Sequence, residues 1–427
     1  IGKHFHGLVT TSGYGIDELP VSPPEHGYID TSGANAPVLA DGMIPIMWDG
    51  VKWVKADESN LTTSAYPWYN YTNKLWANAV MVSTNRVSTT RQQYMDADPG
   101  TTILEDDIIA YYVWIPRYRY TLFNVGTNTV PEQLINVTFE TADTQKSTGS
   151  TVGSDLTHPA FTWGAGDNIQ ELEGIWVGKF ETSYVSNHWN PRIKPNRDSY
   201  FPVLIYQYYQ SANQLDSDTY LTTTGVSQID VHMMKNTEWG AVAYLKQSAY
   251  GLGTTDIALN NYYNSGHYMT GCGYNSSNTT CSGYSSDNGK SSSTTGNITG
   301  VYDMAGGNLE LVMGVYSSGT TIIYDSYTTA SDFSPTLSCT ANTYVNCYNN
   351  IINLSSDYSA RILGDATAET RGWYGDNATF LISNDSFSIF LRGGIAGEDD
   401  ESISGIFDFF NEFSGMDTFR VSAFVIK

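Results

Sequence analysis

The sequence predicts an irregular α+β fold, rich in strands and long loops, and three observations point to it. Only 15% of the 427 residues are charged, whereas tyrosine (31) and glycine (39) are abundant, which is typical of β- and loop-rich extracellular proteins. Several short segments alternate with the two-residue period of a strand, and one segment has clear helical periodicity. Long stretches without periodicity separate them, and no repeat of solenoid length is present.

The first predicted element is an extended N-terminal arm, residues 1–41. Glycine, proline and serine interrupt it, and no hydrophobic periodicity persists along it. Residues 1–9 alternate in a way that would allow them to be added as a strand to an exposed sheet edge. The arm is therefore predicted either to hold a neighbouring copy of the chain or to lie across its own domain.

A small β-rich segment, residues 42–104, is predicted next. Residues 47–54 read as a hairpin, with Asp49 and Gly50 forming a two-residue type I′ turn. Residues 68–76 are rich in tryptophan and tyrosine. Packing in the core is the favoured interpretation of these rings, and an aromatic platform for carbohydrate is the alternative.

The remaining residues, 105–427, are predicted to form one large domain. Residues 112–116, 135–139 and 419–426 have strand patterns. Residues 236–245 read as a helix that begins at Asn236 or Thr237 and stops before Gly251. In that helix Trp239, Val242 and Ala243 are predicted to form an inward-facing stripe.

The net charge of −23 narrows the range of partners. Forty-four acidic residues against 21 basic ones repel phosphate backbones, so nucleic acid is not an expected partner. The acidic surface serves solubility in one interpretation and binds cations at clustered carboxylates in the other. No apolar run is long enough to span a bilayer, so no membrane-spanning segment is expected.

The four cysteines form two close pairs, Cys272 with Cys281 and Cys339 with Cys347. Four cysteines allow three pairings, and the short spacing within polar segments favours the two local bridges. Neither pair has the spacing of a zinc or redox site. Two such bridges indicate an oxidising compartment, so an extracellular location is expected.

Six motifs in order resemble the formylglycine-generating-enzyme-like family, whose fold is a branch of the C-type-lectin fold. They are VWIP at residues 113–116, GIWVGKFET at 174–182, NTEW at 236–239, GVYDMAGGNLE at 300–310, LRGG at 391–394 and FRV at 419–421. The amino-acid sequence of residues 233–242 resembles that of a subgroup of secreted proteins from bacteria and their phages, which often have pilus-like or surface roles. The resemblance covers residues 105–427 and implies an irregular C-type-lectin-like domain there.

The resemblance also implies a calcium site. Its ligands would be the side chains of Asp303 and Glu310 with the backbone carbonyls of Gly306 and Asn308. A glycine-rich turn between two carboxylates suits a cation that takes six to eight oxygen ligands. The chain departs from the family pattern at residues 307–309 and 311, and a tight turn with ordinary capping carboxylates is the alternative.

Catalysis is not expected, and neither is copper. The family's sulfatase-activating chemistry requires a pair of thiols, because copper in such a site takes soft ligands, but no cysteine lies between Arg392 and Phe419. The seven histidines are scattered, and no nucleophile elbow, phosphate loop or metalloprotease motif is present.

A ligand-contacting surface is predicted in the C-terminal loops, residues 395–418 with the two aromatic residues before them. Acidic residues are interleaved there with phenylalanine and methionine, which suits a basic or amphipathic partner; a charged loop over buried phenylalanines is the alternative. The residues assigned to this surface are Trp373, Tyr374, Glu398, Asp399, Asp400, Glu401, Asp408, Phe410, Asn411, Glu412, Phe413, Met416 and Asp417.

Two functions follow as expectations. The first is a non-catalytic extracellular protein that binds a protein or carbohydrate ligand, or mediates adhesion, through its C-terminal lectin-like loops. The alternative is a structural subunit of an extracellular filament, a pilus-like assembly or phage fibre, in which copies assemble through the arm. An arm folded back on its own domain would favour the first.

Overall fold

The computed structural model describes residues 29–83, 90–126, 129–164, 169–199, 203–215, 229–324, 329–340, 343–349, 361–376, 378, 389–395, 404–410 and 418–425. Within these ranges the chain is strand-rich, with short helices between several sheets, so the predicted α+β class is confirmed.

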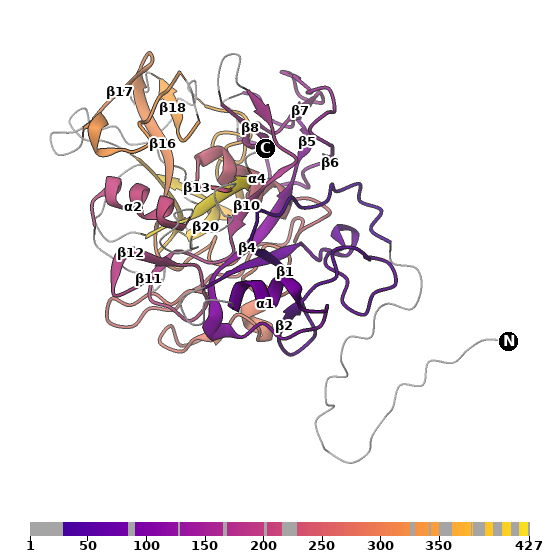
Figure 1. Ribbon diagram of the computed structural model, residues 1–427. Helices are drawn as coiled ribbons and strands as arrows, with labels where there is room; N and C mark the ends of the chain where they lie inside the picture. The colour runs from indigo at the N-terminus through magenta and orange to yellow at the C-terminus, as the bar shows by residue number, and fades with distance from the viewer. Residues whose placement is uncertain are drawn as a thin grey trace.

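The largest sheet among the described residues has seven antiparallel strands in the order β13-β22-β10-β4-β3-β1-β2. These are β1 (Met43–Trp48), β2 (Trp53–Lys55), β3 (Asn78–Val82), β4 (Ile108–Pro116), β10 (Gly174–Gly178), β13 (Ile229–Met233) and β22 (Val421–Val425). Because β3 pairs with β4, this sheet runs across the boundary predicted between residues 104 and 105 (Figure 1).

A second sheet is centred on β16 and contains β16 (Glu310–Ser318), β17 (Thr321–Ile322), β18 (Asn346–Asn349), β19 (Ile389–Gly394), β20 (Ser404–Phe410) and β21 (Thr418–Phe419). The smaller pairings involve β5 (Tyr118–Thr121), β6 (Val137–Phe139), β7 (Asp155–Thr157), β8 (Thr162–Trp163), β9 (Gln170–Glu171), β11 (Ser183–Val185), β12 (Asn187–Arg192), β14 (Cys272–Gly273) and β15 (Ser282–Gly283).

The helices are short. They are α1 (Thr90–Asp96), α2 (Ile205–Ala212), α4 (Asn236–Lys246) and α5 (Asp287–Ser291), with 3₁₀ turns η1 (Tyr71–Asn73), η2 (Glu105–Asp107), η3 (Pro159–Phe161), η5 (Asn213–Leu215), η6 (Ala330–Asp332) and η7 (Trp373–Gly375). In the parts of the chain that the structure describes, none of these helices has the length and apolar character needed to cross a bilayer.

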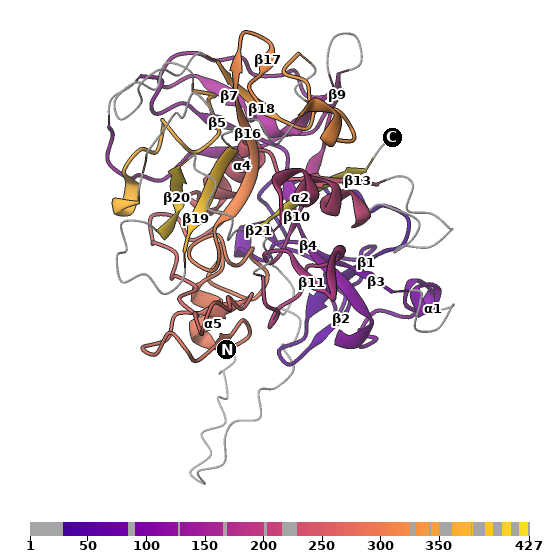
Figure 2. The same ribbon diagram turned by 90° about the vertical axis from the view of Figure 1, so that its left-hand side faces the viewer.

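Helix α4 confirms the predicted helix. It contacts β4 of the first sheet and β16 of the second, so it lies between them (Figure 2). All eleven of its residues are buried. A Cβ atom on Gly240 would lie 1.9 Å from the Gly364 carbonyl oxygen, so the backbone packs directly against a distant loop. Trp239, Val242 and Ala243 are buried as predicted, and partners cover the other faces of the helix as well.

The predicted hairpin is present, but its turn is longer than expected. Trp48 of β1 is paired with Trp53 of β2, which leaves a four-residue loop. The Asp49 carboxylate accepts hydrogen bonds from the backbone N–H groups of Val51 (2.9 Å) and Lys52 (2.8 Å). This side-chain cap replaces the predicted two-residue type I′ turn.

The other strand predictions are confirmed in part. Residues 112–116 lie in β4, but only 137–139 of the predicted 135–139 form a strand. The predicted strand at 419–426 is divided, since β21 ends at Phe419 and β22 begins at Val421. Arg420, between them, turns its side chain into a buried charged cluster.

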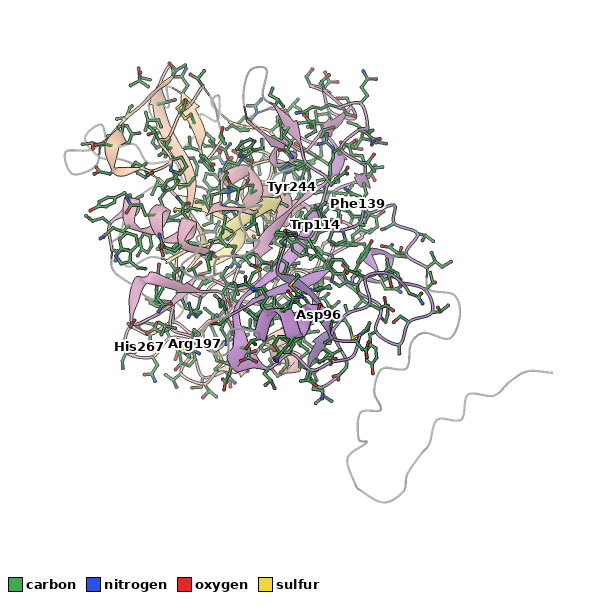
Figure 3. The ribbon with its side chains drawn as sticks, in the orientation of Figure 1. Asp96, Trp114, Phe139, Arg197, Tyr244 and His267 are labelled. Atoms are coloured by element: carbon green, nitrogen blue, oxygen red, sulfur yellow. A yellow bond between two sulfur atoms is a disulfide. The ribbon has the colours of Figure 1, made fainter. Side chains whose placement is uncertain are left out.

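Aromatic side chains fill the interior. Trp114, Phe139 and Tyr244 are buried, whereas Arg197 and His267 lie near the lower-left edge of the molecule in Figure 3. The rings of residues 68–76 are also buried, and Tyr71 stacks on Trp76 with 6.4 Å between ring centroids. The favoured interpretation of that stretch as core is confirmed.

The described part of the predicted arm lies on its own domain. Asp30 accepts a hydrogen bond from the backbone N–H of Tyr71 (3.0 Å), and Asn35 donates to the Glu173 carboxylate (2.9 Å). The indole of Trp176 donates to the Val38 carbonyl (2.8 Å). Residues 1–28, to which the sheet-edge prediction refers, lie outside the described residues.

Candidate functional site

Both predicted disulfides are present. Cys272 is bonded to Cys281 with 5.0 Å between their Cα atoms, and Cys339 to Cys347 with 5.5 Å. Since the sequence contains four cysteines, every thiol is used in a bridge. Neither pair is available as a thiolate ligand while the bridges are intact.

The motif GVYDMAGGNLE forms part of a buried charged cluster, here called the acid-rich cluster: Glu181, Asp303, Glu310 and Arg420. All four side chains are buried. The Arg420 guanidinium lies 2.7 Å from a Glu310 carboxylate oxygen and also donates to the carbonyls of Gly178 (2.8 Å) and Tyr302 (2.9 Å). Arg420 is therefore the one cation among the three acids of this cluster.

Asp303 is held by N–H donors. Its carboxylate accepts from the side-chain amide of Asn260 (2.9 Å) and from the backbone of Gly271 (2.8 Å). Asp303 itself has a left-handed backbone, with φ 61°. These bonds fix the turn that carries the next residues of the motif.

Glu181 enters the cluster from the segment after β10. Its Oε1 atom accepts a hydrogen bond from the backbone N–H of Asn308 (2.8 Å). A Cβ atom on Gly307, where φ is +80°, would lie 2.2 Å from that oxygen. The departure from the family pattern at residue 307 thus has a physical reason: the side chain of Glu181 fills the space.

Burial and mutual repulsion raise the pKa values of these acids. Burial, followed by the charges of Asp303 and Glu310, raises the pKa of Glu181 well above its usual range. Burial also raises the pKa of Asp303, and it raises the pKa of Glu310 to about 7 even though Arg420 opposes the shift. All three shifts favour the protonated form of the acids.

Both carboxylates among the predicted calcium ligands already have partners within the protein. Both Asp303 oxygens accept N–H donors, and Glu310 is paired with Arg420. Across the described ranges, no group of three or more His, Cys, Asp or Glu side chains is arranged to hold a metal ion. The calcium site at Asp303, Gly306, Asn308 and Glu310 has no support here and stays a prediction. Melting with free calcium and with a chelator tests it.

Much of the predicted ligand surface lies outside the described residues. This applies to Glu398, Asp399, Asp400, Glu401, Asn411, Glu412, Phe413, Met416 and Asp417, and to the side chain of Phe410. Asp408 is described and is fully buried.

Trp373 requires a correction, because it lies in the core and is 1% exposed. Its ring stacks on Phe123 (5.3 Å between centroids), and its indole N–H donates to the Val130 carbonyl (2.9 Å). A residue whose ring and polar atom are both used internally cannot contact a ligand without unfolding its surroundings.

Tyr374, the neighbouring prediction, does reach the surface. Its hydroxyl accepts from the Gln247 side chain (2.7 Å) and donates to the Thr254 carbonyl (3.1 Å). Its ring lines a hollow of about 240 Å³ together with Tyr274, Asp376 and Ser404. We call this the Tyr374 hollow.

The floor of the Tyr374 hollow carries a perturbed acid. Burial raises the pKa of Asp376 to about 8, so this carboxyl is largely protonated at neutral pH. One of its oxygens accepts from the backbone N–H of Phe407 (2.9 Å). Behind the Tyr374 ring, the ammonium of Lys246 lies 4.8 Å from the ring centroid, and burial lowers its pKa to about 8.

Sequence reasoning missed Glu181, Asp376 and Lys246. Glu181 follows a strongly apolar strand, and a charge in such a position was the available signal. For Asp376 the sequence offered a weaker signal than for Glu181, namely Gly405. A Cβ atom on Gly405 would lie 2.1 Å from the Asp376 carboxylate oxygens, so β20 needs glycine at that point.

Comparison with known proteins does not place the chain in a family. No protein-family model matches it, and no curated protein is significantly similar to it in sequence. The family resemblance therefore depends on the motifs alone.

Proposed function

We propose that this chain is a non-catalytic extracellular binding protein with a C-terminal domain of the C-type-lectin type, and that the Tyr374 hollow is part of its ligand site. The hollow carries the proposal, because it combines half-exposed tyrosine rings with a protonated carboxylic acid. Small-molecule and side-chain pockets commonly combine such an apolar wall with a few fixed polar groups.

The chemistry of the hollow indicates the kind of group it takes. A protonated Asp376 donates a hydrogen bond, and the rings of Tyr274 and Tyr374 offer flat apolar surface. An uncharged acceptor, such as an amide or a hydroxyl next to an apolar face, fits this combination. Display on the surface of the producing cell or virus is consistent with the two disulfides.

The absence of a free thiol supports the non-catalytic part of the proposal. Sulfatase-activating chemistry on this fold needs thiolates, and the four cysteines are bridged. The assay is conversion of a Cys-x-Pro-x-Arg peptide with copper supplied; turnover above the metal-free control contradicts this part.

Binding is tested with an array of glycans and peptides probed by the labelled full chain. Tyr274, which is 53% exposed, is the best position to change, because Tyr274→Ala removes a wall of the hollow and little packing. We expect it to weaken binding about tenfold, the loss of roughly one aromatic contact. Tyr263→Ala, at a 36% exposed tyrosine outside the hollow, is the matched control. Equal losses in both variants, or an array without binding, contradict the proposal.

The filament subunit remains the alternative proposal. The contacts of Asp30, Asn35 and Val38 with their own domain favour a stand-alone binder for that part of the arm. Deleting residues 1–20 and comparing particle size by light scattering separates the two. Assembly of the full chain that the deletion abolishes supports the filament.

A further inference from the structure

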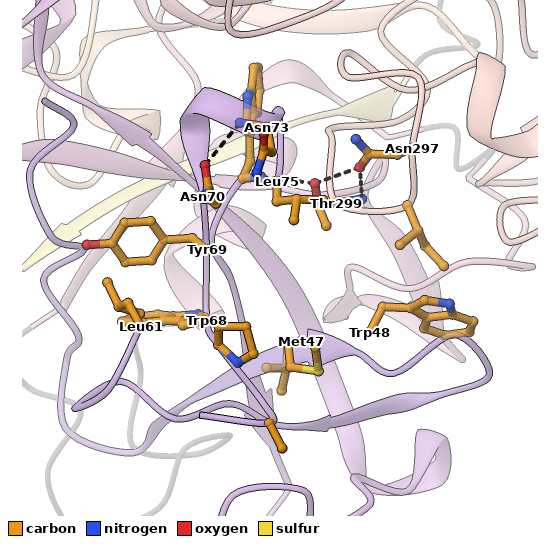
Figure 4. A pocket seen from close by; sticks show the side chains of 15 residues that line it. Met47, Trp48, Leu61, Trp68, Tyr69, Asn70, Asn73, Leu75, Asn297 and Thr299 are labelled. Atoms are coloured by element: carbon orange, nitrogen blue, oxygen red, sulfur yellow. Dashed lines mark hydrogen bonds between the residues drawn. The ribbon is translucent and has the colours of Figure 1, made fainter. Parts of the chain in front are cut away.

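Two hollows lie outside the Tyr374 hollow and share one wall, Trp48. The first, which we call the aromatic hollow, has a volume of about 230 Å³ and is bounded by Trp48, Leu61, Trp68 and Tyr69 (Figure 4). The second, which we call the charged hollow, has a volume of about 500 Å³ and includes Lys52, Glu105, Asp106, Lys194 and Arg197. Trp48 itself is half-buried, so its ring is accessible from solvent.

The aromatic hollow has no titratable acid or base except the hydroxyl of Tyr69. Its polar groups are the side chains of Asn70, Asn73, Asn297 and Thr299. They are largely fixed by internal bonds, such as those from the backbone N–H of Asn73 to Asn70 (3.0 Å) and from the hydroxyl of Thr299 to Asn297 (2.7 Å) (Figure 4). A neutral ring with an apolar face suits this wall, since a charged group would lose its hydration without gaining a partner.

The charged hollow gathers cations in a chain that has few. Three of the 21 basic residues line it, Lys52, Lys194 and Arg197, against the two acids Glu105 and Asp106. Its lining therefore carries one net positive charge, although the whole chain carries −23. A ligand with a single negative charge is complementary to it, whereas a phosphate dianion or a sulfate cluster would meet the two acids as well.

Arg197 is the cation that faces outward. Its backbone is fixed by bonds with Thr270, from the Arg197 N–H to the hydroxyl (3.1 Å) and from the Thr270 N–H to the Arg197 carbonyl (2.9 Å). Its exposed guanidinium has no ion pair or hydrogen bond within the part of the chain that the structure describes, and it lies at the edge of the molecule in Figure 3. Lys194, by contrast, is buried and paired with Glu105 at 3.2 Å.

Aromatic surface and hydroxyl acceptors complete the charged hollow. The indole of Trp53 donates to the hydroxyl of Tyr284 (3.1 Å), and the hydroxyl of Tyr111 donates to the Glu105 carboxylate. The ring of Tyr284 meets that of Trp48 edge to face, with 6.4 Å between centroids. The carboxylates of Glu105 and Asp106 accept hydrogen bonds from hydroxyl groups, which an inorganic anion does not offer.

We propose that the two hollows on either side of Trp48 form one groove for an acidic oligosaccharide, with a carboxylate-bearing sugar beside Arg197 and an uncharged sugar face in the aromatic hollow. The carboxylate pairs with the guanidinium, the ring hydroxyls donate to Glu105 and Asp106, and Trp48 packs against both sugars. A peptide with an acidic residue next to an apolar one could also pair with the Arg197 guanidinium and pack on Trp48. It offers fewer hydroxyl donors for Glu105 and Asp106.

The test uses three probes with the full chain: a disaccharide of one glucuronate and one galactose, its methyl ester and inorganic sulfate, each measured by calorimetry. The acid and the ester have the same rings and differ in charge. We expect the acid to bind about tenfold more tightly than the ester, the contribution of roughly one charge-assisted hydrogen bond. Equal affinity for acid and ester, or a response to sulfate as strong as to the acid, overturns the proposal.

Variants then separate the two halves of the groove. Arg197→Gln should lower affinity for the acid about tenfold and leave the ester unchanged, because only a charge pair is lost. Trp48→Ala should weaken the binding of both the acid and the ester. Lys146→Gln, which removes a positive charge from an exposed pair with Glu171, is the control and should change neither. Loss of acid binding in Lys146→Gln to the same extent, or none in Arg197→Gln, contradicts a specific site. Tyr274→Ala leaves this binding intact if the two sites are separate.

Discussion

Two buried charged clusters in this molecule respond to burial in opposite ways. The acid-rich cluster has three carboxyls for one arginine, and the pKa values of all three carboxyls are raised. The second, which we call the balanced cluster, consists of Asp230, His232, Lys235 and Glu238 where β13 meets α4. In this cluster the pKa of His232 is raised and that of Glu238 is lowered, and both shifts favour the charged form.

Hydrogen bonds and paired charges account for the balanced cluster. Burial alone would lower the pKa of His232, but the charge of Glu238 and the hydrogen bonds that the His232 ring donates to Asp230 (2.7 Å) and Glu238 (3.2 Å) raise it to about 9. Burial alone would raise the pKa of Glu238, but Lys235 and His232 lower it to about 2. The comparison teaches that the ratio of cations to anions, rather than depth, decides which buried groups keep their charge.

The largest expected effect comes from removing the single cation of the acid-rich cluster. Arg420→Met leaves Glu310 buried with no counter-ion, so we expect the free energy of unfolding to fall by about 3–5 kcal/mol. Urea denaturation measures it. The double variant Arg420→Met, Glu310→Gln should recover part of the loss, and a loss that the double variant does not reduce would show that packing, not charge, is responsible.

A smaller loss is expected from unbalancing the second cluster. Glu238→Gln keeps an acceptor for the backbone N–H of Lys235 (2.8 Å) but removes the charge between His232 and Lys235. We expect a destabilisation of about 2–3 kcal/mol. The same denaturation experiment checks it, and stability equal to wild type contradicts the assignment of His232 as a cation.

The pH dependence of stability distinguishes the two clusters further. The folded-state pKa of His232 is raised from 6.5 to about 9, so its contribution is complete below pH 6.5 and is lost as pH rises to 9. The folded-state pKa of Glu310 is raised to about 7, so stability also falls as pH rises from about 4.5 to 7. We expect His232→Gln to remove the loss of stability between pH 6.5 and 9, which is on the order of 2 kcal/mol. The loss of stability between pH 4.5 and 7 should remain. Thermal melts across pH 4–10 measure both.

The smallest effect is expected from Glu181→Gln. Burial and the charges of Asp303 and Glu310 hold the pKa of this carboxyl well above its usual range, and glutamine offers the same acceptor to the backbone N–H of Asn308. We expect stability within about 1 kcal/mol of wild type at neutral pH, in contrast to Glu238→Gln. A large loss in both variants would remove the distinction between the clusters.

Local patterns predicted the local parts of this fold. The helix at residues 236–245, the hairpin around Trp48 and Trp53 and both disulfides depend on residues close together in the chain, and all are present. The predicted turn was wrong because the Asp49 side chain, not the backbone alone, closes it.

The site was harder to predict because its contacts join distant segments. Glu181 meets Asn308 across 127 positions, and Arg420 meets Glu310 across 110. The motif around Asp303 indicated a carboxylate cluster, but nothing local reveals that an arginine lies where a cation was expected. Trp373 and Tyr374 are adjacent, yet one lies in the core and the other lines a hollow, because η7 turns the backbone between them.

The position of β22 has a consequence for how the protein is made. Residues 421–425 form a central strand that pairs with both β10 and β13, so the seven-stranded sheet stays in two parts until they arrive. A ribosome must pass residue 425 before that sheet can close. Such long-range pairing is slow and leaves strand edges exposed.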